Sequence, residues 1–162
     1  MFQRKREVKD PHDTQAIEQA VVFLLGRREQ SAAELQRKMR AKGFHPDAVD
    51  EVLASLQQRG WQSDERFAES LIRQRTESCY GPLKIYADMQ QKGIDRGLTE
   101  AILERININW QQLAVARYQR RFGTEPPADD KEAARRQRHL AARGFYPADV
   151  YAACKIAVQA PD

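Results

Sequence analysis

Arginine and lysine side chains gather in the C-terminal third of this 162-residue chain. At about 100° per residue, those within 131–143 fall on one side of a predicted helix, across roughly 160° of arc. Others lie on the helix before it. Such an arrangement suits phosphates or an acidic protein groove, because cationic groups donate charge-assisted hydrogen bonds to both. The predicted binding residues are Arg117, Arg120, Arg121, Lys131, Arg135, Arg136, Arg138 and Arg143.

Arginine outnumbers lysine in this group, which favours forked, oriented contacts over diffuse charge. The alternative is a solvated amphipathic face that needs no partner. A second, weaker basic group lies nearer the N-terminus, where Glu29 and Glu34 dilute its charge, and there the two interpretations stay open. This secondary group consists of Arg37, Lys38, Arg40 and Lys42.

Residue patterns that carry catalysis are missing from the sequence. It has no Gly-rich phosphate loop, no G-x-S-x-G motif and no H-E-x-x-H motif. His12, His45 and His139 lie far apart, without the spacing of metal ligands. We therefore predict that the protein is not an enzyme and has no cofactor and no metal.

The cysteines and the hydropathy of the sequence indicate in which cellular compartment the protein is expected. Cys79 and Cys154 are widely separated and form no C-x-x-C pair, which suits a reducing compartment. The longest purely apolar run, 20–25, is too short to cross a bilayer. We expect a monomeric cytoplasmic protein that makes no membrane contact.

The elements that carry these residues are predicted from a repeated signature of one basic residue, glycine and one apolar residue. It occurs as Lys42-Gly43-Phe44, Lys92-Gly93-Ile94 and Arg143-Gly144-Phe145. A period of about fifty residues indicates a tandem array rather than one enzyme core. Helix-forming residues dominate, so we predict an all-α fold of three tandem three-helix repeats, with the glycines acting as helix stops.

The predicted segments are a flexible tail at 1–13 and helix-turn-helix-like repeats at 14–60, 61–108 and 109–162. Ser31 and Glu34 match a capping box, in which each residue satisfies a backbone N–H of the other. Pro82 suits the first position of a helix. Asp64 and Asp129 are predicted to lie at helix N-termini, where the macrodipole favours negative charge.

Alignment of the three glycines makes Arg136 conspicuous, because it replaces the apolar Leu35 and Ile85 of the other repeats. Either its helix is rotated or its face is exposed because no fourth repeat follows. The inward side of that helix is expected to hold Ala133, Gln137, Leu140 and Ala141.

Other residues receive structural roles from the same alignment. Trp61 and Trp110 each precede the first helix of a repeat and are predicted to be hydrophobic pegs between repeats. Cys154 aligns with aliphatic core positions, so a buried, inert thiol is expected. Cys79 precedes a helix start, but no partner histidine is apparent.

Several motifs together resemble one known family. Gly60-Trp61-Gln62-Ser63-Asp64-Glu65-Arg66-Phe67-Ala68, followed by Gly81-Pro82, Ile85 and Lys92-Gly93-Ile94, is similar to the RecX family of recombinase regulators. Arg28-x-x-Ser31-x-x-Glu34-Leu35 and Arg143-Gly144-Phe145 are similar to the flanking repeats of that family. The resemblance covers about residues 14–158, and it departs at 61–63, where family members often have an aliphatic residue or Tyr-Leu-Asp.

The resemblance implies three three-helix units in an elongated, curved molecule. It also implies binding to RecA-type recombinase filaments on single-stranded DNA, and inhibition of their ATP hydrolysis, strand exchange and co-protease activity. Two alternatives stay open: non-specific DNA binding by the helix-turn-helix-like units, and a helical scaffold for acidic proteins.

Overall fold

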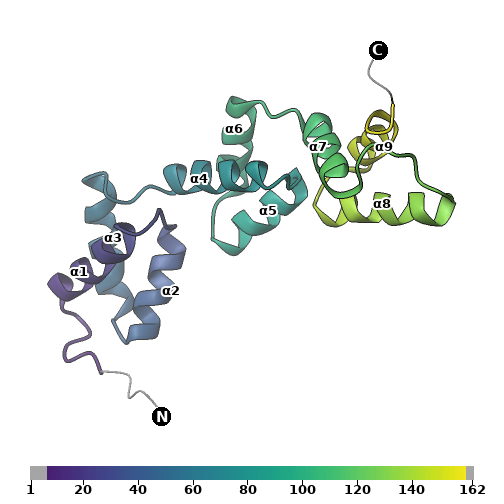
Figure 1. The fold of residues 1–162 in the computed structure, drawn as a ribbon. Coiled ribbons are helices and arrows are strands. Elements are labelled where there is room, and N and C mark those ends of the chain that lie inside the picture. The colour runs from purple at the N-terminus through teal and green to yellow at the C-terminus, as the bar shows by residue number, and fades with distance from the viewer. Residues whose placement is uncertain (1–6, 160–162) are drawn as a thin grey trace, which may run out of the picture. The chain divides into compact units, whose positions relative to one another are not determined.

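The computed structural model describes residues 7–159 and has only α-helices as regular elements in that range, which confirms the all-α prediction (Figure 1). Within the same range, no helix is both long enough and apolar enough to span a membrane. The helices are α1 (Thr14–Leu25), α2 (Ala32–Lys42), α3 (Pro46–Gln58), α4 (Asp64–Glu77), α5 (Pro82–Gln91), α6 (Arg96–Ile106), α7 (Trp110–Phe122), α8 (Asp130–Ala142) and α9 (Pro147–Ile156).

The chain divides into two compact units. The first contains α1, α2, α3, the start of α4 up to Ser70, and residues 91–95. Its core lies among α1, α2 and α3, because their apolar residues recur at helical spacing and meet there. Fully buried side chains in this core include Ile17, Val21, Leu35, Met39 and Leu56.

Capping residues set the helix ends of the first unit. The Ser31 hydroxyl accepts a hydrogen bond from the backbone N–H of Glu34 (3.1 Å), and Gly43 ends α2 with a φ of +101°, as predicted. The other half of the predicted capping box is wrong: the Glu34 carboxylate forms ion pairs with Arg28, Lys38 and Lys92 instead. Ser63, rather than Asp64, accepts from the first turn of α4, through the N–H of Arg66 (3.2 Å).

Part of the predicted tail contacts the first unit. The backbone N–H of His45 donates to the carbonyl of Pro11 (2.8 Å), and the His12 and His45 rings lie 4.4 Å apart. Val8 packs against the core. The remainder of that segment, residues 1–6 with Arg4-Lys5-Arg6, lies outside the described residues.

The second unit contains residues 71–90 and the chain from Arg96 onward. One of its cores lies among α7, α8 and α9, with Tyr118, Leu140 and Phe145 buried. Asn109 and Asp129 cap α7 and α8 by accepting from the N–H groups of Gln112 (3.0 Å) and Glu132 (2.8 Å). These caps set the first residues of α7 and α8, the two helices that carry most of the predicted binding residues.

In the first unit, the Lys92-Gly93-Ile94 signature lies against the beginning of α2. The carbonyl of Lys92 accepts from the Ser31 hydroxyl (2.7 Å). Gly93 has a φ of +71°, and a Cβ there would lie 2.5 Å from the Cβ of Ala33. Glycine therefore serves both the backbone conformation and the close approach.

In the second unit, the Arg143-Gly144-Phe145 signature repeats this contact at the beginning of α5. The N–H of Gly81 donates to the carbonyl of Arg143 (2.8 Å), and the N–H of Leu83 donates to the carbonyl of Gly144 (2.9 Å). Loop carbonyls thus satisfy N–H groups that a helix start leaves unpaired. The prediction that the signature glycines are only helix stops is incomplete, because two of them are also contact points.

The prediction of tryptophan pegs is wrong for Trp61, whose side chain is 53% exposed. Trp110 is half-buried and packs against the core of α7, α8 and α9. Asp64 takes a role that the sequence did not indicate: its Oδ1 accepts from the backbone N–H of Ala32 (2.9 Å) and from the amide of Gln62 (3.0 Å). It therefore links α4 to α2 within the first unit.

Candidate basic binding face

The predicted binding residues of α7 and α8 divide into exposed and half-buried side chains. Arg117, Arg136 and Arg143 are half-buried. The exposed members are Arg120, Arg121, Lys131, Arg135 and Arg138. The exposed members are the ones that a partner can reach without rearrangement of the fold.

Phe122, at the end of α7, brings cations from both helices together. The guanidinium groups of Arg121, Arg135 and Arg136 lie 5.8, 5.5 and 5.2 Å from its ring centroid. At such distances the ring quadrupole attracts a cation. Three basic residues of α7 and α8 therefore meet around one aromatic ring.

Arg136 is held inside the third repeat, with its side chain only 11% exposed. It donates to the Tyr118 hydroxyl (2.8 Å), the carbonyl of Glu125 (2.8 Å) and the Glu132 carboxylate (3.1 Å). Its charge is satisfied by these partners, which explains how arginine occupies an apolar position of the repeat. Arg136 is thus engaged within the fold rather than presented to a partner.

The orientation of α8 differs from the expected one. Gln137 and Ala141, which were predicted to face inward, are exposed, whereas Leu140 is fully buried. The helix keeps the register of the other repeats: Arg136 turns inward as Leu35 and Ile85 do, and Ala141 is exposed as Arg40 and Gln90 are. Neither expected explanation for the substitution holds, because Arg136 stays at the inward position and is held there by Tyr118, Glu125 and Glu132.

Arg143 and Arg117 also have partners within the second unit. Arg143 donates to the carbonyl of Ser78, and its guanidinium lies 3.5 Å from the centroid of the Tyr80 ring. Arg117 donates through Nε to Nε2 of His139 (3.0 Å). Both contacts join different helices or loops, so these arginines act as structural ties.

His139 accepts the Arg117 bond with its neutral imidazole. Burial lowers the pKa of His139, and the charges of Arg117, Arg121, Arg143 and Arg135 lower it further. A proton on Nε2 would remove the acceptor and add a cation to an arginine cluster. The arrangement therefore requires neutral histidine.

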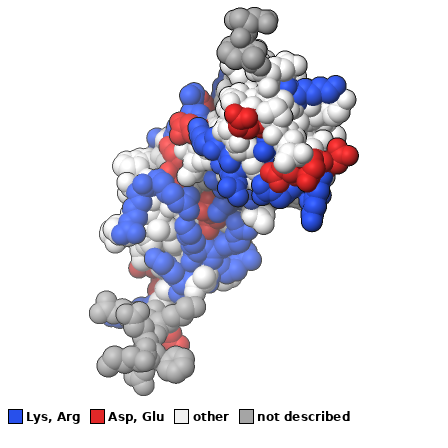
Figure 2. Space-filling view, turned by 45° about the vertical axis from the view of Figure 1, so that its right-hand side comes forward, with Lys and Arg blue, Asp and Glu red and all other residues white. Residues whose placement is uncertain are grey.

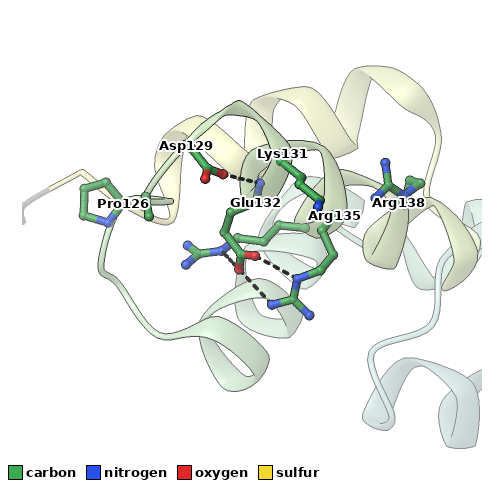
Figure 3. A pocket seen from close by; sticks show the side chains of 8 residues that line it. Pro126, Asp129, Lys131, Glu132, Arg135 and Arg138 are labelled. Atoms are coloured by element: carbon green, nitrogen blue, oxygen red, sulfur yellow. Dashed lines mark hydrogen bonds and ion pairs between the residues drawn. The ribbon is translucent and has the colours of Figure 1, made fainter.

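A hollow of about 440 Å³ opens at the start of α8 (Figure 3). The Glu132 carboxylate lies within it and accepts from Arg135 (2.7 and 2.8 Å) as well as from Arg136. Hydrogen bonds from Arg135 and Arg136 lower the pKa of Glu132 to about 2. Arg138 lies apart from this ion-paired group in Figure 3. The charge of Arg135 is thus partly neutralised, whereas Lys131 and Arg138 line the hollow as exposed cations.

The secondary basic group is also divided. Lys38 donates to the side-chain oxygen of Gln30 and lies 3.8 Å from the Glu34 carboxylate. Arg37 donates to the carbonyl of Gln91 (3.0 Å). Arg40 and Lys42 are exposed. These two are the more accessible members of the group.

Sequence reasoning missed a buried carboxylate cluster in the first unit. The Glu34 side chain is only 4% exposed and pairs with Arg28 (3.0 Å), Lys92 (3.5 Å) and Lys38 (3.8 Å). Burial raises the pKa of Glu34, but the hydrogen bond from Arg28 and the three positive charges outweigh it, so the pKa is lowered overall. The i,i+4 spacing of Glu34 and Lys38 was the available signal.

A second missed cluster surrounds Tyr80 in the second unit. Asp88 pairs with Arg75 (2.6 Å) and Lys84 (2.9 Å), and both cations lie 6.0 Å from the Tyr80 ring. Burial raises the pKa of Asp88, but the hydrogen bonds from these two partners lower it overall. Together with Arg143, the cluster fixes the contact between the start of α5 and the third signature.

Both cysteines are at least partly buried. Cys79 is buried. Cys154 is half-buried and packs against the core of α7, α8 and α9, in agreement with its predicted position. Burial raises the pKa of the Cys154 thiol, an effect that Arg136 partly opposes. Within residues 7–159, no three His, Cys, Asp or Glu side chains form a group that could hold a metal.

Lys and Arg cover much of the face shown in Figure 2, with Asp and Glu interleaved among them. This mixed surface agrees with the pairing found around Glu132 and Glu34. The anion-binding capacity of each unit therefore rests on the exposed cations that are left over, rather than on the total count.

Three family models match consecutive parts of the chain. The model described as "RecX, first three-helix domain" matches residues 18–56, the second-domain model matches 63–103, and the third-domain model matches 109–154. Each match includes most of three helices of the structure. The comparison thus finds three tandem three-helix domains in the order that the repeat predicted.

Curated relatives are similar over most of the chain. The "Regulatory protein RecX" of Pseudomonas syringae pv. tomato is 38% identical over 135 residues, which cover 83% of this chain and 86% of the relative. That of Halorhodospira halophila is 37% identical over 144 residues and 89% of each chain. That of Xanthomonas campestris pv. campestris is 39% identical over 127 residues and 78% of each chain.

Two solved structures share the fold. The crystal structure of RecX from Lactobacillus salivarius has a TM-score of 0.76 at 19% identity, and the match covers 90% of this chain and 96% of that one. A second crystal structure, of a regulatory protein RecX, has a TM-score of 0.72 at 21% identity, covering 90% and 73% of the two chains.

Proposed function

Because this chain belongs to the RecX family of regulatory proteins, we propose that it binds RecA-type recombinase filaments on single-stranded DNA and inhibits them. The regulated activities are ATP hydrolysis, strand exchange and co-protease activity. The protein acts as a monomer in the cytoplasm, in DNA repair and homologous recombination, and it contributes no catalytic step of its own.

The observation that carries the binding site is the set of exposed cations left on α7 and α8. Arg120, Arg121, Lys131 and Arg138 are exposed, whereas three other predicted members are held by partners inside the fold. Guanidinium and ammonium groups bind phosphate and carboxylate oxygens with charge-assisted hydrogen bonds. Several weak contacts along a filament add up through multivalency.

A charge-reversal experiment tests this site. The variant combines Arg120→Glu, Arg121→Glu, Lys131→Glu and Arg138→Glu, and the assay is single-stranded-DNA-dependent ATP hydrolysis by a recombinase. We expect the concentration for half inhibition to rise at least about fourfold, since exposed ion pairs contribute roughly 0.2–1 kcal/mol each and four are lost. The control variant combines Arg27→Glu and Arg59→Glu, which are exposed cations of the first unit.

Unchanged inhibition by the four-residue variant would refute the site. Co-sedimentation then separates the modes of action, with the filament compared against DNA alone and recombinase alone. Binding to DNA alone, with log affinity falling steeply against log salt, would instead support non-specific DNA binding by the three-helix units. Binding to an acidic protein without DNA or filament would support the scaffold alternative.

A further inference from the structure

Each three-helix repeat has a seam between its second and third helices, and in the first repeat a polar link crosses it. The amide of Gln36 on α2 donates to the carboxylate of Asp50 on α3 (2.9 Å). These residues lie seven positions before and seven positions after the signature glycine, Gly43. The same two positions can therefore be compared in the other repeats.

The second repeat also closes its seam with an acidic residue. Tyr86 and Glu100 occupy the two positions around Gly93. Arg96 joins them: its guanidinium lies 4.8 Å from the Tyr86 ring centroid, and its Nε donates to Glu100 (3.0 Å). In both repeats, the third helix thus supplies a carboxylate that is used within the seam.

The third repeat departs from this pattern. Gln137 and Tyr151 occupy the two positions around Gly144, so an aromatic ring replaces the carboxylate. One turn later, where the second repeat has Glu104, this repeat has Lys155. The seam between α8 and α9 has therefore lost negative charge and gained a cation and an exposed ring.

Two hollows open along this seam. The larger is about 470 Å³, and Ala141, Phe145 and Val150 contribute to its largely apolar lining. The smaller is about 210 Å³ and includes Lys155 in its lining. Gln137 and Tyr151 line both. At the exposed position where the other repeats have the long side chains of Arg40 and Gln90, this repeat has Ala141, which lines the larger hollow.

Basic residues lie on both sides of this groove. Arg138 lines the larger hollow and Lys155 the smaller. Tyr151 is 59% exposed, and the Lys155 ammonium lies 4.3 Å from its ring centroid. The groove therefore offers an apolar floor for one large side chain and cations beside it for carboxylates.

We propose that this groove, defined by Gln137, Arg138, Ala141, Phe145, Tyr151 and Lys155, binds a short acidic segment of a partner protein through one large apolar side chain. The floor favours such a side chain over a nucleobase, because Phe145, Val150 and Ala141 provide no hydrogen bonds for base edges. Lys155 also occupies one face of the Tyr151 ring. The site shares Arg138 with the proposed filament face, but its apolar floor, Tyr151 and Lys155 are not part of that face, and the proposal does not depend on that function.

Fluorescence anisotropy with the full-length chain tests the groove without recombinase or DNA. The probe is a labelled peptide of about twelve Asp and Glu residues with one central Phe, compared with the same peptide carrying Ser instead. A labelled oligothymidine of similar length is the nucleic-acid probe. Tyr151→Asp places at this exposed position the residue type of Asp50 in the first repeat. Lys155→Glu places the residue type of Glu104 in the second repeat.

Phe23→Asp is the matched control. Phe23 is also an exposed helical aromatic residue, with a cation four residues later, since Arg27 lies 4.9 Å from its ring centroid. We expect Tyr151→Asp to weaken binding of the Phe peptide at least about tenfold, as for a central anchor residue. Lys155→Glu should also weaken binding of the Phe peptide, whereas Phe23→Asp should bind that peptide like the unsubstituted chain. The unsubstituted chain should bind the Ser peptide at least about tenfold more weakly than the Phe peptide.

Equal binding by Tyr151→Asp and Phe23→Asp would overturn the proposal. So would an oligothymidine that binds in a Tyr151-dependent manner while the peptide does not, because the occupant would then be nucleic acid. These measurements leave the proposed regulatory function untouched, since that function is tested by the ATPase assay with the α7 and α8 variants.

Discussion

Gly144→Ala should destabilise the protein well beyond the usual effect of placing alanine at a left-handed position. Gly144 has a φ of +94°, and a Cβ there would lie 2.5 Å from the backbone nitrogen of Lys84 and 2.7 Å from its Cβ. Neither atom belongs to the flexible end of a side chain. The start of α5 and the third signature would have to separate.

The expected loss has two parts. The left-handed backbone conformation costs alanine about 1–2 kcal/mol. Overpacking against a fixed neighbour costs about 1–3 kcal/mol more. We therefore expect the free energy of unfolding to fall by roughly 2–5 kcal/mol for Gly144→Ala.

Gly43→Ala provides the matched control, because Gly43 occupies the same place in the first signature. Its φ is +101°, but a Cβ there would meet only Val8, at an ordinary contact distance of 3.8 Å. This variant should lose only the conformational part, about 1–2 kcal/mol. The difference in the loss of unfolding free energy between the two variants gives the cost of the close contact with Lys84.

Urea denaturation followed by circular dichroism measures both losses, and fluorescence of Trp110 reports on the repeat that contains Gly144. At this chain length, each kcal/mol corresponds to roughly 2–4 °C in the thermal midpoint. Equal losses for Gly144→Ala and Gly43→Ala would show that the close approach to Lys84 has no energetic cost, which would refute this prediction.

Two further predictions concern titratable groups. Glu34→Gln should lower the free energy of unfolding by about 2 kcal/mol in urea denaturation at pH 7, because it leaves Arg28, Lys38 and Lys92 without their carboxylate. The expected loss is smaller than for a fully buried ion pair because the three cations are partly exposed. An unchanged midpoint would contradict it. His139 has a lowered pKa when folded, so the unfolded chain binds the proton more readily, and stability should fall as the pH drops below about 6.5. His139→Gln should make the thermal midpoint less dependent on pH between 7 and 5.5, and an unaltered dependence would contradict the role of the Arg117 bond.

Local signals in the sequence predicted the helices well. Ser31, Pro82 and Asp129 each mark a helix start at the predicted place, because capping and proline preferences act within one turn. The period of the signature also predicted three tandem repeats, which the family models match. These features depend on residues that are close in sequence.

Long-range contacts account for what could not be predicted. Glu34 fits a capping box locally, yet Lys92, far along the chain, is among the cations that hold its carboxylate. Arg136 was correctly marked as unusual, but its partners Tyr118 and Glu125 could be identified only from the way α8 packs against α7 and the loop between them. The same packing leaves Gln137 and Ala141 exposed, although the sequence pattern of α8 alone had placed them inward.

The early start of α8 sets a limit on the length of the array. Counted from the signature glycine, Glu132 stands where Ser31 and Gly81 begin the corresponding helices, but α8 has already begun at Asp130. Its backbone at that point is inside a helix, so the N–H groups equivalent to those of Gly81 and Leu83, which donate to the third signature, are already committed; that of Glu132 donates to Asp129. A further copy of the repeat, fused after this one, would therefore find no free N–H groups at the beginning of α8 for the carbonyls of its signature loop.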